Sequence, residues 1–467
     1  MAEENEIIDP SSYSDSAPMF SVNTEVVLLY GGDDPKKTLN IPVGKIRRLD
    51  VKESFFTRLP QLTVVLGDQG NYFNNYGFQI GHIFYVRITP IISNKDLLPK
   101  PYVWAKFVIQ SIEYTTDMDR NNYIYTFNCV YEAEKYLNDI CVWPRVDIDM
   151  ANVNRKYTSE ELLQLVVPMG GLSFISDLES SPDDSMAWLN ASLTYSEFVD
   201  KIVKHAWIDD EDMPLLYVDK EGTAHYNSIN NLCKQASKAV YIPTALYNKK
   251  YLDTSNNPNK KPSGYRTYTD IEFHNIGYIQ NQGGYGVKST IYNPFNVLEL
   301  NPIEFKPLVA KDPTLLANTT LNDSCIRYRD FHDSKLRIGN ISNKSPGQTD
   351  NMRFLMTKMH FKDTHQYYDY AEQHNESIKR AFFQQFVFIT VDVPNQPDYD
   401  FNPNQKIMLG DRITIRTDNL GYEASKQTGD YIVTGITHNF YSSSNYTMLI
   451  TAVSDGINGI NEMKKQK

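Results

Sequence analysis

Short apolar segments that alternate with polar residues recur along the first third of the chain, and they constrain the fold more than any other feature. Each segment is rich in β-branched or aromatic residues and ends at a cluster of turn-forming residues. The predicted strands are Glu25–Tyr30, Ile46–Val51, Leu62–Leu66, Ile83–Ile88, Lys106–Tyr114 and Tyr123–Val130. This spacing predicts a small antiparallel β-barrel or sandwich.

The pattern changes near residue 135, where helix signals replace strand signals. The segments Thr158–Glu161 and Thr194–Glu197 match the capping box that opens an amphipathic helix. A predicted hairpin follows, with Gly222 at the end of its turn. Residues 136–232 are therefore expected to form an α+β insert.

A second β-rich region is expected after the insert, at residues 233–456. It contains a polar loop at 245–266, a predicted helix at 366–382, and a final series of strands. These late strands are Phe386–Val393, Asp411–Arg416, Asp430–Asn439 and Tyr446–Val453. The remaining boundaries define a flexible or extended arm at 1–20, a first β-domain at 21–135 and a C-terminal tail at 457–467.

Two segments on either side of the insert repeat one pattern. The first comprises IGHIFYVRI (80–88), KFVIQSIEYTT (106–116) and NNYIYTFNCV (121–130), and the second comprises LGDRITIRT (409–417), DYIVTGITHNF (430–440) and SNYTMLITAV (444–453). Gly81 aligns with Gly410, and Ile112 aligns with Ile436. Either the chain carries two similar β-domains, or two unrelated hairpins have converged on the same alternation.

The C-terminal region resembles the baseplate central hub proteins of contractile-tailed bacteriophages, a family related to the hub part of type VI secretion spike proteins. The resemblance lies in FVFITVDVP (386–394), IMLGDRITI (407–415) and GDYIVTGITHNFYSSSNYTMLITAVSDGI (429–457). His438 stands where family members often carry a histidine. The segments MAWLNASLTYSEFVDKIVKHAWI (186–208) and PLLYVDKEGTAHY (214–226) resemble the family's intervening domain.

This resemblance implies a mainly β fold with an α+β insert and two tube-like antiparallel β-barrel domains per chain, which form a pseudo-six-fold ring as a homotrimer. It implies a structural hub, not an enzyme, that adapts the six-fold tail tube to the three-fold central spike around a lumen for DNA passage. The implied partners are a separate central spike or tail lysozyme protein, tail tube or tube-initiator proteins, and baseplate wedge proteins. The implied location is the virion tail baseplate, after assembly in the host cytoplasm.

The charge of the chain agrees with a lumen that does not bind DNA specifically. There are 46 basic and 57 acidic side chains, a net charge of −11, which disfavours adhesion to nucleic acid or anionic lipid. The first twenty residues lack a basic start and an apolar stretch, and no apolar run approaches about 18 residues. A signal peptide and direct membrane insertion are therefore not expected.

Four cysteines lie far apart, without a CxxC motif, and are expected to be buried free thiols. They are Cys129, Cys141, Cys233 and Cys325. The motif Gly31–Thr38 lacks the glycine before lysine that a P-loop needs, and Gly284–Ser289 lacks the third glycine of a dinucleotide site. Both motifs are expected to be turns.

No catalytic, cofactor-binding or metal-ligating residue is expected, and no cofactor. The densest potential ligands lack metal-site spacing and are expected to be surface or interface residues; they are His360, Asp363, His365 and His374. The acidic run Asp209–Asp212 is expected to be a solvated helix end rather than a cation site. The lysine pairs at 249–250 and 260–261 are expected in a solvated or protein-contacting loop.

The repeat also predicts which side chains fill the core and which segments meet partners. The predicted core residues are Phe107, Ile109, Ile112, Tyr431, Ile432, Val433 and Ile436. Partner contacts are expected at the hairpin tips 117–122 and 441–445, at the insert and at the N-terminal arm.

Two other functions stay open at this level. One is a different tail ring component, such as a distal tail or wedge protein, which would form a hexamer or await its partners as a monomer. The other is a β-rich carbohydrate-binding or carbohydrate-processing protein, for which the 32 tyrosines would supply stacking and a pocket would hold paired carboxylates.

Overall fold

The computed structural model describes the sheets, the insert and the segments that join them. The described residues are 22–30, 37–69, 77–90, 103–117, 122–144, 155–178, 180–209, 212–247, 265–275, 287–292, 300–304, 353–358, 365, 368, 371–372, 375, 379, 382–383, 385–393, 407–417, 428–441 and 445–454. The expected arm at 1–20 and the tail at 457–467 lie outside them, as do residues 118–121 and 442–444 of the two predicted hairpin tips and residues 248–264 of the polar loop.

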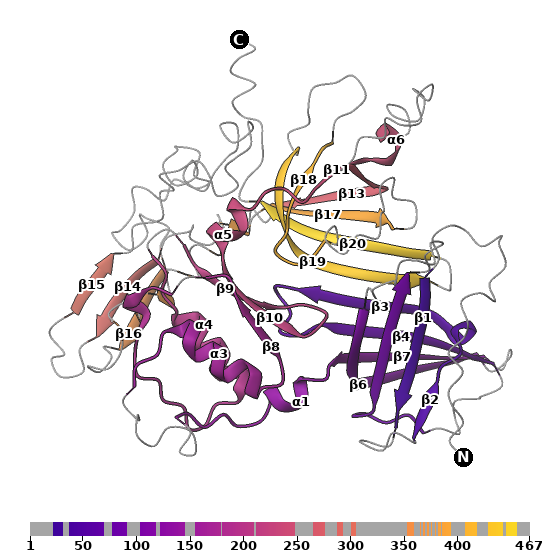
Figure 1. Ribbon diagram of the computed structural model, residues 1–467, viewed down its shortest axis with the longest axis horizontal. Coiled ribbons are helices and arrows are strands. Elements are labelled where there is room, and N and C mark those ends of the chain that lie inside the picture. Colours follow the sequence, from indigo (N-terminus) through magenta and orange to yellow (C-terminus); the bar gives the residue numbers. More distant parts are fainter. Residues whose placement is uncertain are drawn as a thin grey trace, which may run out of the picture.

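A continuous sheet of 14 strands dominates the described part of the chain and divides into two halves (Figure 1). The N-terminal half-sheet comprises β1 (Val22–Leu29), β2 (Thr38–Asn40), β3 (Ile46–Ser54), β4 (Gln61–Gln69), β5 (Ile83–Pro90), β6 (Val103–Asp117) and β7 (Asn122–Tyr131). The C-terminal half-sheet comprises β11 (Ala239–Pro243), β12 (Tyr265–Tyr268), β13 (Asp270–Asn275), β17 (Gln385–Asp392), β18 (Arg412–Ile415), β19 (Gly429–Tyr441) and β20 (Asn445–Ser454). The expectation of a mainly β fold is therefore confirmed.

The two half-sheets share one strand order. The N-terminal order is β3-β4-β7-β6-β5-β1-β2, and the C-terminal order is β13-β17-β20-β19-β18-β11-β12. The halves differ at one end: β1 is antiparallel to β5 and β2, whereas β11 is parallel to β18 and β12. Seven strands in a matching order are more than two converged hairpins would share.

Backbone hydrogen bonds place the repeat at single-residue register. The Gly81 N–H donates to the Ile109 carbonyl at 2.9 Å, and the Gly410 N–H donates to the Val433 carbonyl at 2.8 Å. Both glycines have positive φ, at 91° and 82°, a conformation that favours glycine. A bulge follows Ile109 in β6 and follows Val433 in β19. The shared turn, bulge and order confirm the internal repeat.

Strands β3 and β19 join the two half-sheets. Residues Arg48 to Ser54 pair antiparallel with Gly435 to Tyr441. Figure 1 shows the yellow strands β19 and β20 lying directly above indigo β3 and β4. The paired strands among the described residues do not close into a ring, so each half is an open sheet rather than the closed barrel that the sequence led us to expect.

The insert has helices packed beside a small mixed sheet. Its helices are α1 (Glu134–Leu137), α3 (Ser159–Met169) and α4 (Tyr195–His205), and its strands are β8 (Ser173–Ser176), β9 (Pro214–Val218) and β10 (Thr223–Ser228), in the order β8-β10-β9. Both predicted capping boxes are present, on Thr158 and Thr194. Leu162, Val166, Phe198 and Ile202 are buried in an apolar cluster made mostly of insert residues, which Leu59, Val130 and Tyr368 join from outside the insert. This burial explains the two amphipathic helices.

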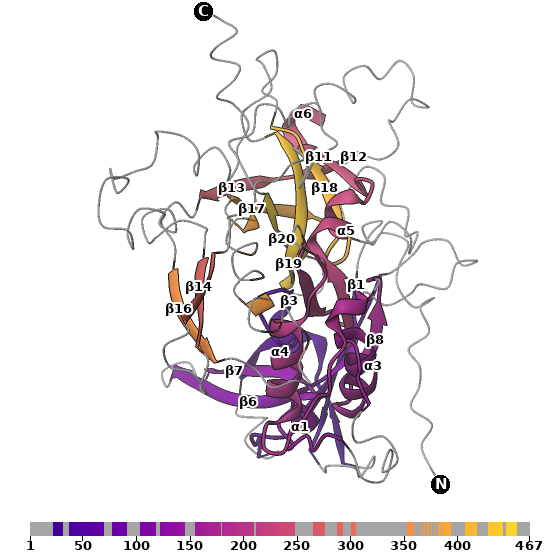
Figure 2. The ribbon, with the colours of Figure 1, turned by 90° about the vertical axis from the view of Figure 1, so that its left-hand side faces the viewer.

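Shorter elements complete the description. They are α5 (Ile229–Lys234), α6 (Thr244–Tyr247), the 3-10 turns Val43–Lys45 and Pro182–Asp184, and a separate sheet of β15 (Leu300–Glu304), β14 (Val287–Tyr292) and β16 (Arg353–Lys358). Figure 2 shows β14 and β16 on one side of the molecule, away from α3.

The expected helix at 366–382 is visible through its described residues, which are helical at Tyr368, Ala371, Glu372, Asn375, Lys379 and Phe382. The sequence places Tyr370, His374, Ile378 and Ala381/Phe382 in register along this helix. Of these only Phe382 is described, and it is buried. Among the other described residues of the helix, Tyr368, Ala371 and Asn375 are buried as well.

Six of the seven predicted core residues are buried, five of them in the core of the large sheet and Ile432 in a smaller apolar cluster beside the insert. Phe107, Ile109, Tyr431, Ile432, Val433 and Ile436 are buried. The prediction for Ile112 is corrected, because this side chain is only partly buried against the core. Its repeat partner Ile436 is covered by β3, whereas no described strand lies at the corresponding edge beside Ile112.

Candidate functional site at the junction of the two sheets

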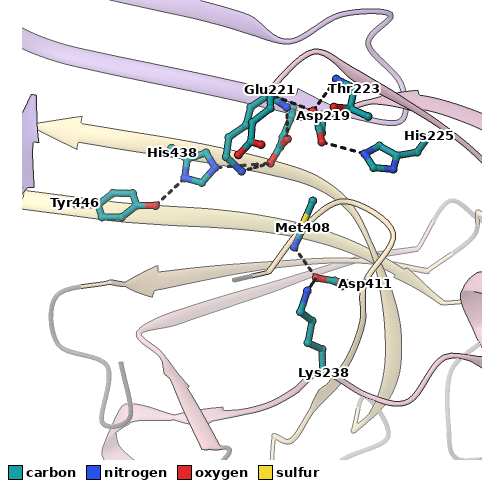
Figure 3. Close-up of polar contacts among 11 residues, drawn as sticks. Asp219, Glu221, Thr223, His225, Lys238, Met408, Asp411, His438 and Tyr446 are labelled. Carbon is teal, nitrogen blue, oxygen red and sulfur yellow. Dashed lines mark hydrogen bonds and ion pairs between the residues drawn. The ribbon is translucent and has the colours of Figure 1, made fainter. Parts of the chain in front are cut away.

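A cluster of buried polar side chains lies where the two half-sheets and the insert meet (Figure 3). We define the junction cluster as Glu53 on β3, Lys220 in the β9–β10 turn, His438 on β19 and Tyr446 on β20. All four residues are buried. Each part of the fold therefore contributes at least one member to a single buried network.

Glu53 is the centre of this network. Its Oε2 accepts a hydrogen bond from the Lys220 backbone N–H at 2.7 Å, and its Oε1 lies 3.4 Å from the Lys220 Nζ. The His438 Nε2 lies 3.7 Å from the same Oε1, and the His438 Nδ1 lies 2.7 Å from the Tyr446 hydroxyl oxygen. The cluster thus links β3, the insert, β19 and β20 through one carboxylate.

The β9–β10 turn is shaped to direct Lys220 into the junction. Asp219 Oδ1 accepts hydrogen bonds from the backbone N–H groups of Glu221 and Thr223, both at 2.9 Å, and its Oδ2 lies 3.0 Å from the His225 Nε2. Gly222 has a φ of 78°. An ideal Cβ at Gly222 would lie 2.1 Å from the Tyr131 hydroxyl oxygen, so the turn needs glycine for both reasons.

Basic groups surround the Glu53 carboxylate in the junction cluster. Burial would raise the pKa of Glu53, but the positive charge of Lys220, the hydrogen bond and charge of His438 and the Lys220 backbone N–H outweigh it, and the pKa falls to about 2. Glu53 is therefore ionised at neutral pH. A buried pair of this kind is costly to break, because removal of one partner leaves the other charged without compensation.

The turn at Gly410, before β18 of the C-terminal half-sheet, is held by a second set of contacts, also drawn in Figure 3. Asp411 Oδ2 accepts from the Met408 backbone N–H at 2.6 Å and from the Lys238 Nζ at 2.8 Å. Burial raises the pKa of Asp411, and the nearby Lys238 opposes this only in part. Beside this turn, Gly410 lies so close to the insert that a Cβ there would be 2.5 Å from the Tyr217 hydroxyl oxygen.

A buried ion pair fixes the return from the insert to the C-terminal half-sheet. Arg412 pairs with Asp430, and its Nη1 donates to the Cys233 carbonyl at 2.7 Å at the end of α5. Met213, Leu232, Phe382 and Val453 belong to one apolar cluster at this place. The insert is therefore attached to the large sheet by polar contacts on one side and by apolar packing on the other.

A cleft of about 760 Å³ lies between the β3–β4 turn, α4 and the helical residues near 375. Apolar side chains such as Phe56, Val199 and Leu216 line it. Its charged residues form ion pairs with each other: Arg58 with Asp200 at 2.7 Å, and Lys204 with Glu372 at 2.6 Å. The cleft offers apolar surface bordered by charge pairs, which suits a structural contact between segments.

The structure places few of the predicted ligand-type residues together. His365 is buried, with its Nε2 3.0 Å from the His205 carbonyl oxygen and 3.8 Å from Asp184 Oδ1, so it is an internal residue rather than a surface one. His360, Asp363 and His374 lie outside the described residues. No group of three potential metal ligands occurs within the described ranges.

The acidic run Asp209–Asp212 is not simply a solvated helix end. Asp212 is buried, and its Oδ1 accepts from the backbone N–H groups of Met213 at 2.8 Å and Asn230 at 3.1 Å. Burial raises the pKa of Asp212 to about 6, despite hydrogen bonds from Ser228, Asn230 and Met213. Asp210 and Glu211 lie outside the described residues.

The remaining predicted motifs are only partly described. Lys37 and Thr38 stand at the start of β2, and Val287–Ser289 begin β14, while the glycines of both motifs and the two lysine pairs lie outside the described part. Cys129, Cys141 and Cys233 are buried and free, as predicted, and Cys325 is not described. Over the residues described, no helix reaches the length and apolarity needed to cross a membrane.

The sequence reasoning missed Glu53 and Lys220. Lys220 looked like an exposed lysine in a polar turn, because lysine is rarely buried. A signal for Glu53 exists in the alternation of β3, where it falls on the same face as the apolar Leu49 and Val51. A charged residue on an inward face needs a partner.

No family model and no curated protein matches the chain. Among similar solved structures, the 43 kDa tail protein of prophage MuSo2 from Shewanella oneidensis is 11% identical, with a TM-score of 0.47 over 93% of this chain and 97% of that one. The tail protein from Neisseria meningitidis MC58 is 11% identical, with a TM-score of 0.49 over 93% and 98%. The half-lidded Francisella PdpA-VgrG complex is 8% identical, with a TM-score of 0.46 over 93% of this chain and 58% of that one.

These neighbours include phage tail proteins, the class that the sequence resemblance named. All three TM-scores lie below 0.5, so the similarities by themselves do not fix a function.

Proposed function

We propose that this chain is the structural hub of a phage tail baseplate. Three copies would form a ring that adapts the six-fold tail tube to the three-fold central spike, around a lumen for DNA passage. The spike or tail lysozyme protein would be a separate chain, and tail tube, tube-initiator and wedge proteins would be neighbours in the virion.

The observation that carries this proposal is the doubled half-sheet. Each chain contributes two units with one strand order, one glycine turn and one bulge position. Three chains would therefore present six similar units, which is what an object of three-fold symmetry needs to meet one of six-fold symmetry. The tube-like barrel of the sequence prediction would then be a property of the assembled ring, completed between units, rather than of one chain.

The described chemistry supports a role without catalysis. The junction cluster is buried and its carboxylate is stabilised by Lys220 and His438, and the ion pairs around the cleft occupy four of its charged side chains. These hydrogen bonds and ion pairs connect the half-sheets and the insert. The net charge of −11 suits a lumen from which DNA is repelled.

Electron microscopy of the purified protein, with light-scattering mass on the same sample, tests this proposal. A three-fold ring with six similar lobes, at three times the chain mass of 53.7 kDa, is the expected result. A hexamer would favour a distal tail or wedge component instead. A monomer with affinity for a glycan array would overturn the hub in favour of a carbohydrate-binding protein.

A further inference from the structure

The long strands β6 and β19 are equivalent in the repeat, but only one of them has both edges paired along its length. The first part of β19 pairs with β18, and its distal part, Gly435 to Tyr441, pairs with β3. The first part of β6 pairs with β5 in the same way. Its distal part, Ser111 to Asp117, has β7 on one edge, and no described strand pairs with the other edge.

Side chains at equivalent positions of β19 and β6 differ in burial. Ile436 and His438 are 1% and 2% exposed beneath β3. Their equivalents are Ile112, which is only partly buried, and Tyr114, which is 71% exposed. An exposed aromatic side chain on an unpaired strand edge is a site for pairing with another strand.

Strand β13 is the repeat equivalent of β3, and the pairing register establishes this. Val51 of β3 lies opposite Leu62 of β4, and Phe273 of β13 lies opposite Val387 of β17. Leu62 pairs with Cys129, and Val387 pairs with Ala452. Cys129 and Ala452 are equivalent, because each lies opposite the residue before the bulge, Ile109 in β6 and Val433 in β19. Phe273 therefore corresponds to Val51.

The outer edge of β13 also has no described strand on it, since β13 pairs only with β17. Ile271 and Phe273 are partly buried against the core, and Glu272 and His274 are exposed. The antiparallel path β13-β17-β20-β19-β3-β4-β7-β6 separates this edge from the distal part of β6. Both views place β13 at the upper end and β6 at the lower end of the sheet (Figures 1 and 2). The two edges therefore lie at opposite ends of this path, and neither has a described strand on it.

We propose that β13 of one copy pairs antiparallel with the distal part of β6 in the next copy, in the register that β3 and β19 use within one chain. This inference rests on the proposed trimeric hub and deepens it by naming the strands that meet. The register follows from the β3–β19 pairing. It places Asn275 opposite Ile112, His274 opposite Glu113, Phe273 opposite Tyr114, Glu272 opposite Thr115, Ile271 opposite Thr116 and Asp270 opposite Asp117.

The side chains brought together are mostly complementary. Phe273 would lie beside Tyr114, whose ring is 6.4 Å from that of Tyr125, and would extend an aromatic row. His274 would lie opposite the acidic Glu113. In this arrangement the sheet of each copy continues into the next, and the ring closes without a free edge.

Cysteine cross-linking tests the register. A chain with Tyr114→Cys and Phe273→Cys carries two thiols that the proposed pairing brings directly opposite each other, close enough for a disulfide. Mild oxidation should then give covalent dimers and trimers. The control chain carries Tyr114→Cys and Glu272→Cys, because a shift of one residue moves the side chain to the other sheet face. We expect at least about tenfold less cross-linked product from the control.

The outcomes separate this inference from the proposed function. Suppose that the wild-type protein has the mass of three chains. If neither β13 cysteine forms a disulfide with Tyr114→Cys, or if the control pair gives more cross-linked product than the test pair, the proposed strand pairing is wrong and the hub stands. If the wild-type mass is that of one chain, the hub is wrong and the pairing falls with it. A disulfide-linked peptide identified by mass spectrometry confirms the register directly.

A second variant tests the same surface without oxidation. Tyr114→Asp places a charge in the proposed contact, whereas Leu189→Asp places one on the insert; both side chains are 71% exposed in the single chain. We expect Tyr114→Asp to shift the trimer midpoint to at least about 100-fold higher concentration, since unpaired charges are strongly disfavoured at interface cores, while Leu189→Asp leaves it unchanged. Equal effects of both variants, or no effect of Tyr114→Asp, would overturn the proposal.

Discussion

Tyr114 and His438 occupy equivalent positions in the two repeats, yet 71% of Tyr114 is exposed while His438 is 2% exposed. The two sites differ in a neighbouring strand. His438 has β3 paired on one edge of its strand and β20 on the other, whereas Tyr114 has β7 on one edge and no described strand on the other. In the C-terminal repeat the distal edge of β19 is therefore paired with a strand, and in the N-terminal repeat the distal edge of β6 is not paired with a described strand.

Removing the charge of Glu53 should strongly destabilise the protein. Glu53→Gln leaves the buried Lys220 ammonium without its carboxylate, which costs about 3–5 kcal/mol in the free energy of unfolding. Lys220→Met should also be harmful, because the buried Glu53 carboxylate loses its ammonium partner and keeps only His438 and the backbone N–H of residue 220. The double variant should be less destabilised than the sum of the two, since neither charge remains. Urea denaturation at pH 7 measures all three, with Glu25→Gln on an exposed face as control; strict additivity would contradict a direct ion pair.

The contribution of Glu53 should depend on pH in a defined window. Its pKa is about 2 in the folded protein against 4.5 in the unfolded chain, so the stabilisation is present above pH 4.5 and is lost as the pH falls toward 2. The shift corresponds to about 3 kcal/mol. The stability difference between wild type and Glu53→Gln, measured by denaturation from pH 7 down to pH 2, should shrink through this window. A constant difference would show that charge is not the cause.

The two repeat glycines should respond differently to alanine. Both have positive φ, so Gly81→Ala should cost about 1–2 kcal/mol from backbone strain alone, with no atom within 4 Å of the new Cβ. Gly410→Ala should cost about 1–3 kcal/mol more, because its Cβ would meet the Tyr217 hydroxyl group. Thermal or urea unfolding of each variant checks this. Tyr217→Phe should relieve part of the extra cost of Gly410→Ala; no relief would rule out the clash.

The two equivalent isoleucines should also differ. Ile436→Ala creates a cavity at a site that is 1% exposed and should lower stability by about 2–5 kcal/mol. Ile112→Ala removes a side chain that is only partly buried in one chain, so it should cost less in unfolding and should weaken association instead. Urea unfolding of dilute protein and light scattering over a dilution series separate the two effects. An equal loss of stability without any change in association would contradict the unpaired edge.

Local signals in the sequence predicted local structure well. The two capping boxes, with Thr158 and Thr194, lie at the starts of α3 and α4, because a cap needs only residues within one turn. The glycines at 81 and 410 and the alternation of apolar and polar residues in β6 and β19 were equally clear in the sequence. The internal repeat then predicted the correspondence of these strands, which the bulges at Ile109 and Val433 confirm.

Contacts between residues far apart in the sequence could not be predicted from these local patterns. The short strands β8, β11 and β12 were missed, because parallel pairing with distant strands leaves little trace in four or five residues. The burial of Lys220 depends on Glu53, 167 residues away. Ile112 was placed in the core because it matches Ile436, but Ile436 lies in a strand segment paired with β3, and no described strand pairs with the corresponding edge of β6.

The β3–β19 pairing also sets the order in which the chain can fold during synthesis. β3 is made early, but its partner lies roughly 380 residues further along, which takes on the order of 20–80 s at about 5–20 residues per second. Throughout this interval the nascent N-terminal half-sheet holds an unpaired edge at β3 that equivalent strands of neighbouring nascent chains could fill. Slow emergence of residues 429–441 therefore creates a period of vulnerability to domain swapping, and crowding of ribosomes on one message would raise that risk.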